Sequence, residues 1–102
     1  MKIRDVTVLK QVKNDLIEGR IFYDSNEKGI GDYFYDSLVA DIESLRLYSG
    51  IHPLHLGLYR MLSKRFPFAV YYIIQDDTAI VVAVLDLRRD PAWIRDKLVS
   101  RT

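Results

Sequence analysis

R-F-P-F-A-V-Y-Y-I-I-Q-D-D-T-A-I-V-V-A-V-L-D-L-R-R-D-P, from Arg65 to Pro91, is the stretch that decides the fold. Its two apolar runs, 70–74 and 80–85, are rich in β-branched and aromatic residues, and Asp76 and Asp77 separate them. Such runs favour strands, and a two-residue polar break favours a hairpin. Both sides of the strands are apolar, so we expect the hairpin in the middle of a sheet and not at an edge.

The two aspartates, taken as the loop, set the register of this hairpin. One side then pairs Ile74 with Ala79, Tyr72 with Val81 and Val70 with Ala83. The other side sets Ile73, Tyr71 and Ala69 against Ile80, Val82 and Val84. Because side chains alternate along a strand, Tyr71 and Tyr72 point to opposite faces of the sheet.

Two stripes of apolar residues at helical spacing precede the hairpin. The first predicts a helix over about 12–26 and consists of Val12, Leu16, Gly19 and Tyr23. The second predicts a helix over about 31–48 and consists of Ile30, Phe34, Leu38, Ile42 and Leu45. The link through Gly29 is short, so the helices form an antiparallel hairpin and bury their stripes on one face of the sheet. Gly19, on the buried face, would let a second element approach closely.

The remaining segments complete an α+β chain. We expect a short first strand over Ile3–Leu9, a strand over 57–63 and a short helix over 92–99. The order β-α-α-β-β-β, followed by that helix, indicates an antiparallel sheet with the N-terminal helical hairpin on one face, in one domain over residues 1–102. The three consecutive strands should form an antiparallel meander from about Leu58 to Leu87, and we expect the first strand beside the last strand of this meander.

Composition limits the class of protein. The 102 residues are 49% hydrophobic and contain no cysteine, so disulfides and thiolate metal sites are excluded and a cytoplasmic location is expected. We find no signal peptide, and no apolar stretch reaches the roughly 18 residues that a membrane span needs. Residues 1–51 carry seven basic against nine acidic residues, whereas residues 52–102 carry eight against five. The basic surplus therefore lies in the strand half.

Several segments, in this order and spacing, are similar to a known family. They are Asp15-Leu16 and Phe22-Tyr23, then Gly29-Ile30-Gly31-Asp32-Tyr33-Phe34, Arg65-Phe66-Pro67-Phe68-Ala69-Val70-Tyr71-Tyr72, and Val84-Leu85-Asp86-Leu87-Arg88-Arg89-Asp90-Pro91. The chain thereby resembles the RelE/ParE superfamily of bacterial toxins from type II toxin–antitoxin modules, also called plasmid stabilisation proteins. The resemblance implies a small cytoplasmic toxin that inhibits growth, is held inactive by a cognate antitoxin protein and needs no cofactor.

The resemblance leaves three functions open. ParE-like members inhibit DNA gyrase without enzymatic chemistry, whereas RelE-like members cut messenger RNA on the ribosome as metal-free endoribonucleases. A third reading is a homologue that binds an antitoxin but has lost toxicity. RelE-like nucleases are more basic than this chain and tend to carry Tyr or His on the C-terminal tail, where this chain has Trp93. Both departures favour the ParE-like branch.

A basic rim is the candidate target-binding site. Arg65 and Arg88 should be neighbours, because the start of one strand and the end of the next lie side by side in a meander. Guanidinium groups suit phosphate or an acidic protein patch. The rim itself consists of four arginines, Arg60, Arg65, Arg88 and Arg89, and the full set of target-binding candidates is Arg60, Lys64, Arg65, Arg88, Arg89 and Tyr59. The competing interpretation is structural, with Arg88 or Arg89 paired to Asp86 or Asp90.

The antitoxin is expected on the sheet face that the helical hairpin leaves open. The candidate residues are Tyr71, Tyr72, Val81, Val82 and Trp93, although the tyrosines also suit a core and Trp93 suits a lid over the sheet end. An open apolar face predicts that the isolated protein forms a homodimer or aggregates. His52 and His55 have a spacing found in metal sites, but Pro53 lies between them and no further ligands are near, so we predict no metal.

Overall fold

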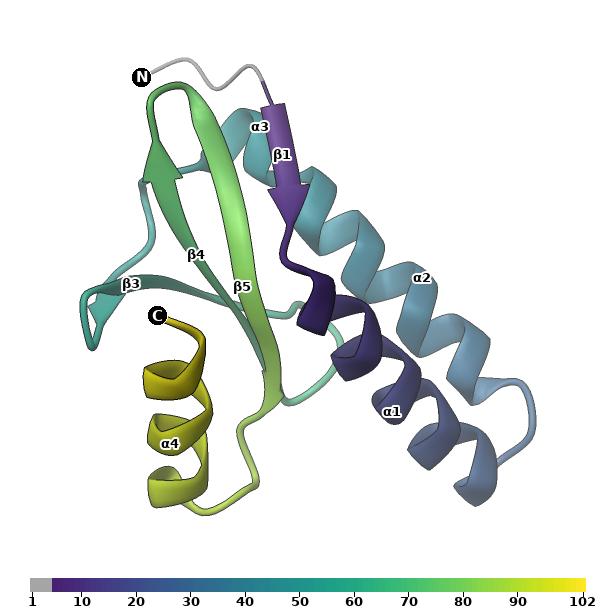
Figure 1. The fold of residues 1–102 in the computed structure, drawn as a ribbon. Helices are drawn as coiled ribbons and strands as arrows, with labels where there is room; N and C mark the ends of the chain where they lie inside the picture. The colour runs from purple at the N-terminus through teal and green to yellow at the C-terminus, as the bar shows by residue number, and fades with distance from the viewer. Residues whose placement is uncertain (1–4) are drawn as a thin grey trace.

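The computed structural model describes residues 5–102, which form a five-stranded sheet with helices on both faces (Figure 1). The α+β class and the helical hairpin are confirmed. The elements in chain order are β1 (Asp5–Val8), α1 (Lys10–Asn26), α2 (Ile30–Glu43), α3 (Leu45–Tyr48), β2 (Leu54–His55), β3 (Leu58–Leu62), β4 (Phe68–Gln75), β5 (Thr78–Asp86) and α4 (Pro91–Arg101). The predicted start of the first strand, Ile3, lies outside the described residues.

The sheet has the strand order β1-β5-β4-β3-β2. Strands β3 to β5 form the predicted antiparallel meander, with β4 in its centre, and β2 pairs antiparallel with β3 outside the predicted range. Strand β1 lies beside β5 as expected, but the two run parallel, from Asp5 opposite Thr78 to Val8 opposite Val81. The sheet is therefore mixed, because the α1–α2 hairpin carries the chain away before it returns to the meander.

The β4–β5 hairpin turns at Asp76 and Asp77, and Asp76 adopts the left-handed conformation that Asp tolerates, with φ of 58°. The predicted register holds from the turn to Tyr72, which pairs with Val81. Beyond that point it is wrong: Val70 pairs with Val84 and Tyr71 with Ala83. A β-bulge leaves Val82 as an extra residue in β5, and no alternation pattern reveals such an insertion.

Helices α1 and α2 lie side by side over one face of the sheet (Figure 1). Their buried stripes meet strand residues such as Val70 and Tyr72 in the larger hydrophobic core. Gly19 permits the close approach: a Cβ built there would lie 2.4 Å from Cε2 of Phe34 on α2. The second predicted helix, 31–48, is divided, because α2 ends at Glu43 and the short α3 follows Ser44.

Helix α4 covers the opposite face of the sheet, where it buries Ile94 and Leu98 against a second core. Its start is fixed by Asp90, whose carboxylate accepts a hydrogen bond from the Ala92 N–H, and by Pro91 in the first turn. The expectation of an open sheet face is therefore wrong. The argument for homodimer formation through that face loses its basis.

A buried ion pair joins α1, the bulge and α4. The Arg101 guanidinium donates to both carboxylate oxygens of Asp15, at 2.6 and 2.8 Å, and to the Val82 carbonyl at 3.2 Å. The Asp15 carboxylate also accepts the Val84 N–H at 2.9 Å. The side chains of Arg101 and Asp15 are only 9% and 8% exposed. The pair thus satisfies backbone groups that the bulge frees from the sheet.

Candidate functional site

An aromatic cluster lies where the β3–β4 connection meets the tip of the α1–α2 hairpin. Phe66 belongs to that connection, and its ring centroid lies 4.9 Å from that of Tyr23 and 5.4 Å from that of Tyr33. Tyr23 also stacks on Phe34, at 5.1 Å. Phe66 therefore joins a tyrosine of α1 to a tyrosine of α2.

Two of the predicted site residues, Arg65 and Arg88, contact this cluster, each at a different tyrosine. Arg65 donates to the Tyr33 hydroxyl at 3.0 Å, and its guanidinium lies 5.9 Å from the centroid of that ring. Arg88 donates to the Tyr23 hydroxyl at 3.2 Å. The Arg88 guanidinium also lies 5.5 Å from the Phe22 ring, within range of a cation–π contact. We call Arg65, Arg88, Tyr23, Tyr33, Phe22 and Phe66 the arginine–aromatic rim.

Arg88 is held in place by Asp86. Its side chain donates to both carboxylate oxygens, at 2.9 and 2.8 Å, so the structural interpretation of this arginine also holds. Desolvation works to raise the pKa of Asp86, but hydrogen bonds from Arg88 outweigh it and the net pKa is lowered. Burial raises the pKa of Tyr23, and the nearby Arg88 charge partly opposes this. At neutral pH the carboxylate is therefore ionised and the phenol is neutral.

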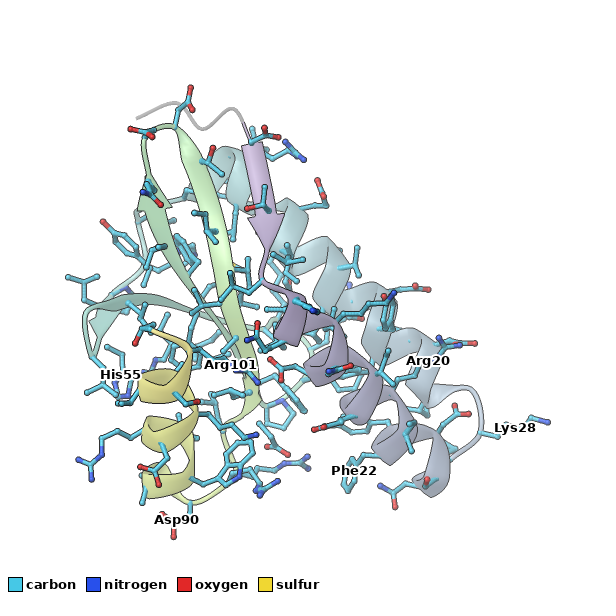
Figure 2. All side chains as sticks on the ribbon, in the orientation of Figure 1. Arg20, Phe22, Lys28, His55, Asp90 and Arg101 are labelled. Atoms are coloured by element: carbon cyan, nitrogen blue, oxygen red, sulfur yellow. The ribbon has the colours of Figure 1, made fainter. Side chains whose placement is uncertain are left out.

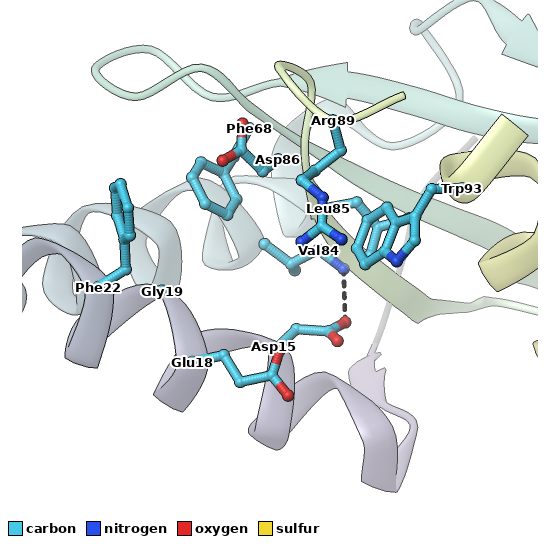
Figure 3. Close-up of a pocket in the computed structure, with 10 residues that line it drawn as sticks. All are labelled: Asp15, Glu18, Gly19, Phe22, Phe68, Val84, Leu85, Asp86, Arg89 and Trp93. Atoms are coloured by element: carbon cyan, nitrogen blue, oxygen red, sulfur yellow. Dashed lines mark hydrogen bonds between the residues drawn. The ribbon is translucent and has the colours of Figure 1, made fainter. Parts of the chain in front are cut away.

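Arg89 points to the α4 side, where its guanidinium lies 3.9 Å from the centroid of the Trp93 ring. It shares with Trp93 a groove of about 200 Å³ that separates α1 from the end of β5 (Figure 3). Asp15, Glu18 and Phe22 come from the α1 side of this groove. Residues from two ends of the chain therefore meet at the edge of β5.

The other predicted target-binding residues lie elsewhere. The expected rim of four arginines is divided, because Arg60 lies on the α4 face whereas Arg65 and Arg88 contact the helical hairpin. Tyr59 stacks on Tyr72, with centroids 5.1 Å apart, and packs against the larger core. Its neighbour Arg60 lies opposite Tyr71, on the α4 face. Lys64 lines a separate pocket with His52 and Met61. Side chains alternate along β3, so the adjacent residues Tyr59 and Arg60 point to opposite faces of the sheet. Their adjacency in the sequence already implies this.

Four of the five antitoxin-facing candidates are not at the surface. The exposed fraction is 0% for Tyr71, Tyr72 and Val81 and 3% for Val82, because helices cover both faces of the sheet. Trp93 alone of the five is partly exposed. Among the exposed apolar side chains of the described residues are three on α1: Ile17, Ile21 and Phe22. We call these three residues the outer α1 stripe, which the sequence analysis missed although the spacing from Ile17 to Ile21 is one helical turn.

His52 and His55 have separate surroundings. The Nδ1 atom of His52 lies 2.5 Å from the Tyr72 hydroxyl, which also accepts the Gly50 N–H, and burial lowers the pKa of His52. His55 lies beside Tyr71 on the other face. Across residues 5–102, no three histidine or acidic side chains gather closely enough to hold a metal ion. Each helix in that range is too short or too polar to traverse a bilayer.

The fold of this chain is similar to folds seen in solved structures. No family model matches the sequence, and no curated protein matches it either. A chain of the solved structure "Chromosomal ParDE TA system from P. aeruginosa" superposes with a TM-score of 0.76 at 11% sequence identity. The match covers 83% of this chain and 97% of that one. The fold implied by the sequence resemblance is thus confirmed.

Proposed function

We propose that this protein is the toxin of a type II toxin–antitoxin module and that it acts by binding its target, with DNA gyrase as the favoured target. The observation that carries the proposal is the shared fold, which accounts for 97% of the matched ParDE chain. The sequence segments that resemble the RelE/ParE superfamily favour the same assignment. A cytoplasmic location and growth inhibition follow from this assignment.

The arginine–aromatic rim is the proposed target-binding surface. Its arginines are held by tyrosine hydroxyls and by Asp86, so they can meet an anionic surface with little further loss of side-chain freedom. Arg89 extends the positive surface toward Trp93. Such a surface attracts an acidic protein patch or nucleic acid, and the attraction weakens with salt.

The chemistry of the rim supports binding over RNA cleavage. General acid–base catalysis works best with groups whose pKa lies near the working pH. Here the pKa of Tyr23 is raised and that of Asp86 is lowered, so both move away from neutrality. The RelE-like alternative, cleavage of messenger RNA on the ribosome, remains the second candidate because arginines can stabilise a phosphorane.

The antitoxin is proposed to cover the outer α1 stripe and Trp93, in place of the buried strand residues. Ile21 is 60% exposed and Phe22 is 48% exposed, and Phe22 leads into the groove that Trp93 lines. An antitoxin segment that folds on binding would bury these side chains together. Binding there would also cover Arg88, which contacts Phe22.

Induced expression without an antitoxin tests the proposal. We expect growth arrest with the natural sequence and none with the double variant Arg65→Ala and Arg88→Ala. The matched control is Arg20→Ala, because Arg20 also pairs with an acid, Asp32, and contacts an aromatic ring, Tyr35, but lies outside the rim. Circular dichroism of each purified variant checks that the fold persists.

The pattern of results separates the three functions. Inhibition of DNA supercoiling by purified protein supports the gyrase target, whereas mapped cleavage of ribosome-bound messenger RNA supports the nuclease. Absence of growth arrest with the natural sequence would leave only an antitoxin-binding homologue. Undiminished toxicity of a folded double variant would exclude the rim as the target-binding surface. The outer α1 stripe would then be the next candidate for that surface.

A further inference from the structure

Two acidic residues are buried among residues 5–102, and only one of them is paired with a cation. Asp15 accepts hydrogen bonds through both carboxylate oxygens from Arg101, which lies between α4 and α1 (Figure 2). Asp41 on α2 is 6% exposed, and its carboxylate accepts one hydrogen bond, from the Ser63 hydroxyl at 2.7 Å. No cation from the described part of the chain forms an ion pair with Asp41. Buried charges are normally paired, so this carboxylate calls for an explanation.

Asp41 lines a pocket to which α2, α3, the α3–β2 connection and β3 all contribute. The pocket measures about 350 Å³, which lies in the range of roughly 300–1,000 Å³ that is typical of ligand pockets. Its walls include three large side chains that are well exposed: Tyr48 at 51%, Ile51 at 72% and Leu62 at 57%. A mostly apolar wall with one polar group inside is the usual composition of a binding site.

The charges in this pocket favour a cation. His52 also lines it but is neutral at neutral pH, because burial lowers its pKa, and its Nδ1 is engaged by the Tyr72 hydroxyl. Lys64 is the only cation among the lining residues, and it is exposed. Solvent screens an exposed charge, whereas a buried charge acts through a lower dielectric. The Asp41 carboxylate therefore dominates inside the pocket, and Lys64 opposes it weakly.

We propose that this pocket receives an arginine side chain from a segment of a partner protein, with Asp41 as the acid that pairs with the guanidinium group. Guanidinium suits the site better than ammonium, because it is planar, weakly hydrated and able to stack on an aromatic ring such as Tyr48. The neighbours of that arginine would cover Ile51 and Leu62, since exposed apolar patches mark protein contacts. The pocket shares no residue with the arginine–aromatic rim and does not depend on the proposed toxin function.

Titration of the full chain with the peptide acetyl-Leu-Arg-Leu-amide, followed by NMR, tests the site. We expect saturable shifts of the Ser63 amide and of the His52 ring signals. Asp41→Asn keeps an acceptor for the Ser63 hydroxyl but removes the charge, so it should weaken the affinity at least tenfold. The peptide acetyl-Leu-Gln-Leu-amide should bind the natural sequence at least tenfold more weakly. Shifts that do not saturate, or equal affinity in Asp41→Asn, would overturn the proposal.

Lys64→Gln tests the competing structural interpretation, in which Lys64 folds over Asp41 and neutralises it. If the pocket is built for an external cation, this variant should keep the melting temperature and bind the arginine peptide at least as tightly as the natural sequence. A lower melting temperature would identify Lys64 as the partner of Asp41, and a weaker affinity would make Lys64 part of the ligand contact. Either result would contradict the proposal.

Melting temperatures of two asparagine variants provide a test that needs no ligand. Asp41→Asn removes a buried charge without a cation and should raise the melting temperature. Asp15→Asn is the matched control, because it leaves Arg101 buried opposite a neutral amide and should lower the melting temperature. A fall in both variants would show that the Asp41 carboxylate is already compensated and would overturn the proposal.

Two further measurements separate a partner protein from other sources of the guanidinium group. Arginine methyl ester should bind at least tenfold more weakly than the peptide, because it lacks the flanking apolar side chains. Equal affinity would make the ligand a free amine. Sedimentation of the full chain should show no self-association that depends on Asp41. An oligomer that Asp41→Asn dissolves would assign the arginine to a second copy of this chain, and either result would overturn the proposed occupant.

Discussion

The two faces of the sheet are closed in different ways. On the α1–α2 face, two long helices bury a continuous apolar core that includes Phe34, Leu38 and Tyr72. On the α4 face, one short helix contributes Ile94 and Leu98 to a smaller core, and the Asp15–Arg101 pair secures its far end. The difference teaches that one face depends mainly on apolar area, whereas the other adds a buried ion pair to a smaller apolar core.

Two neighbouring tyrosines show the same difference at the level of one atom. Both Tyr71 and Tyr72 are 0% exposed. The Tyr72 hydroxyl, on the α1–α2 face, contacts His52 and accepts the Gly50 N–H. The Tyr71 hydroxyl, under α4, makes no well-formed hydrogen bond within the described residues, although the nearby Arg60 side chain partly opposes the rise that burial causes in its pKa. The α4 face is thus the less completely satisfied of the two.

Loss of the ion pair should have the largest effect. Arg101→Ala leaves the Asp15 carboxylate buried without its cation and removes a donor from the Val82 carbonyl. Breaking a buried pair in this way costs about 3–5 kcal/mol. In urea unfolding, this loss of stability should lower the urea concentration at the midpoint of the transition.

The double variant Asp15→Leu and Arg101→Met is the control for that experiment. It removes both charges, so it should be less destabilised than Arg101→Ala alone. Equal losses would mean that the single variant acts through packing, and the contrast between the two faces would fail.

Matched leucine truncations sharpen the comparison. Leu38 on α2 and Leu98 on α4 are 0% and 1% exposed, so Leu38→Ala and Leu98→Ala remove the same buried group from each face. Such truncations cost about 2–5 kcal/mol, depending on how far the surroundings collapse. We expect the larger loss of stability for Leu38→Ala, because α2 packs against both α1 and the sheet. Chemical unfolding of both variants measures the two losses of unfolding free energy. A larger loss in Leu98→Ala would reverse the expected ranking of the two faces.

Gly19→Ala tests how tightly the larger core is packed. The new methyl group would lie 2.4 Å from Cε2 of the fully buried Phe34. Overpacking typically costs about 1–3 kcal/mol, which should exceed the gain of about 1 kcal/mol in helix propensity. Thermal unfolding should show a lower melting temperature, and adding Phe34→Leu should recover part of it. A more stable Gly19→Ala variant would show that the α1–α2 contact is looser than the structure indicates.

The smallest effects are expected from the two tyrosine hydroxyls. Tyr72→Phe removes the acceptor of the Gly50 N–H and should cost about 0.5–1.5 kcal/mol. Tyr71→Phe removes a hydroxyl that makes no well-formed hydrogen bond within the described residues and should be neutral or stabilising. Urea midpoints measured side by side decide the matter, and equal losses would indicate that the Tyr71 hydroxyl is satisfied after all.

Local patterns predicted most of the fold. The 3.6-residue stripes located α1 and α2, and the polar break at Asp76 and Asp77 located the β4–β5 turn. The extra residue Val82 could not be predicted, because both of its neighbours are also apolar and every register of that strand buries apolar groups. The position of α4 was missed because its few apolar residues, Ile94 and Leu98, do not identify the face that they cover.

The candidate site was predictable only in part. Antiparallel pairing indicated that Arg65 and Arg88 would come to the same end of the sheet, and both do reach one aromatic cluster. Their tyrosine partners are distant in sequence, since 65 positions separate Tyr23 from Arg88. Neither periodicity nor spacing encodes such contacts, which depend on how the helical hairpin packs on the sheet.

The ion pair also bears on the order in which the protein can finish folding during translation. Asp15 and Arg101 are 86 positions apart, so the ribosome makes the carboxylate long before its partner. At about 5–20 residues per second the delay is roughly 4–17 s. Once the strands have been made, and until Arg101 follows them, α1 can dock on the sheet only by burying an unpaired charge or by keeping Asp15 in water. The nascent chain must therefore wait for α4 before its final packing is complete.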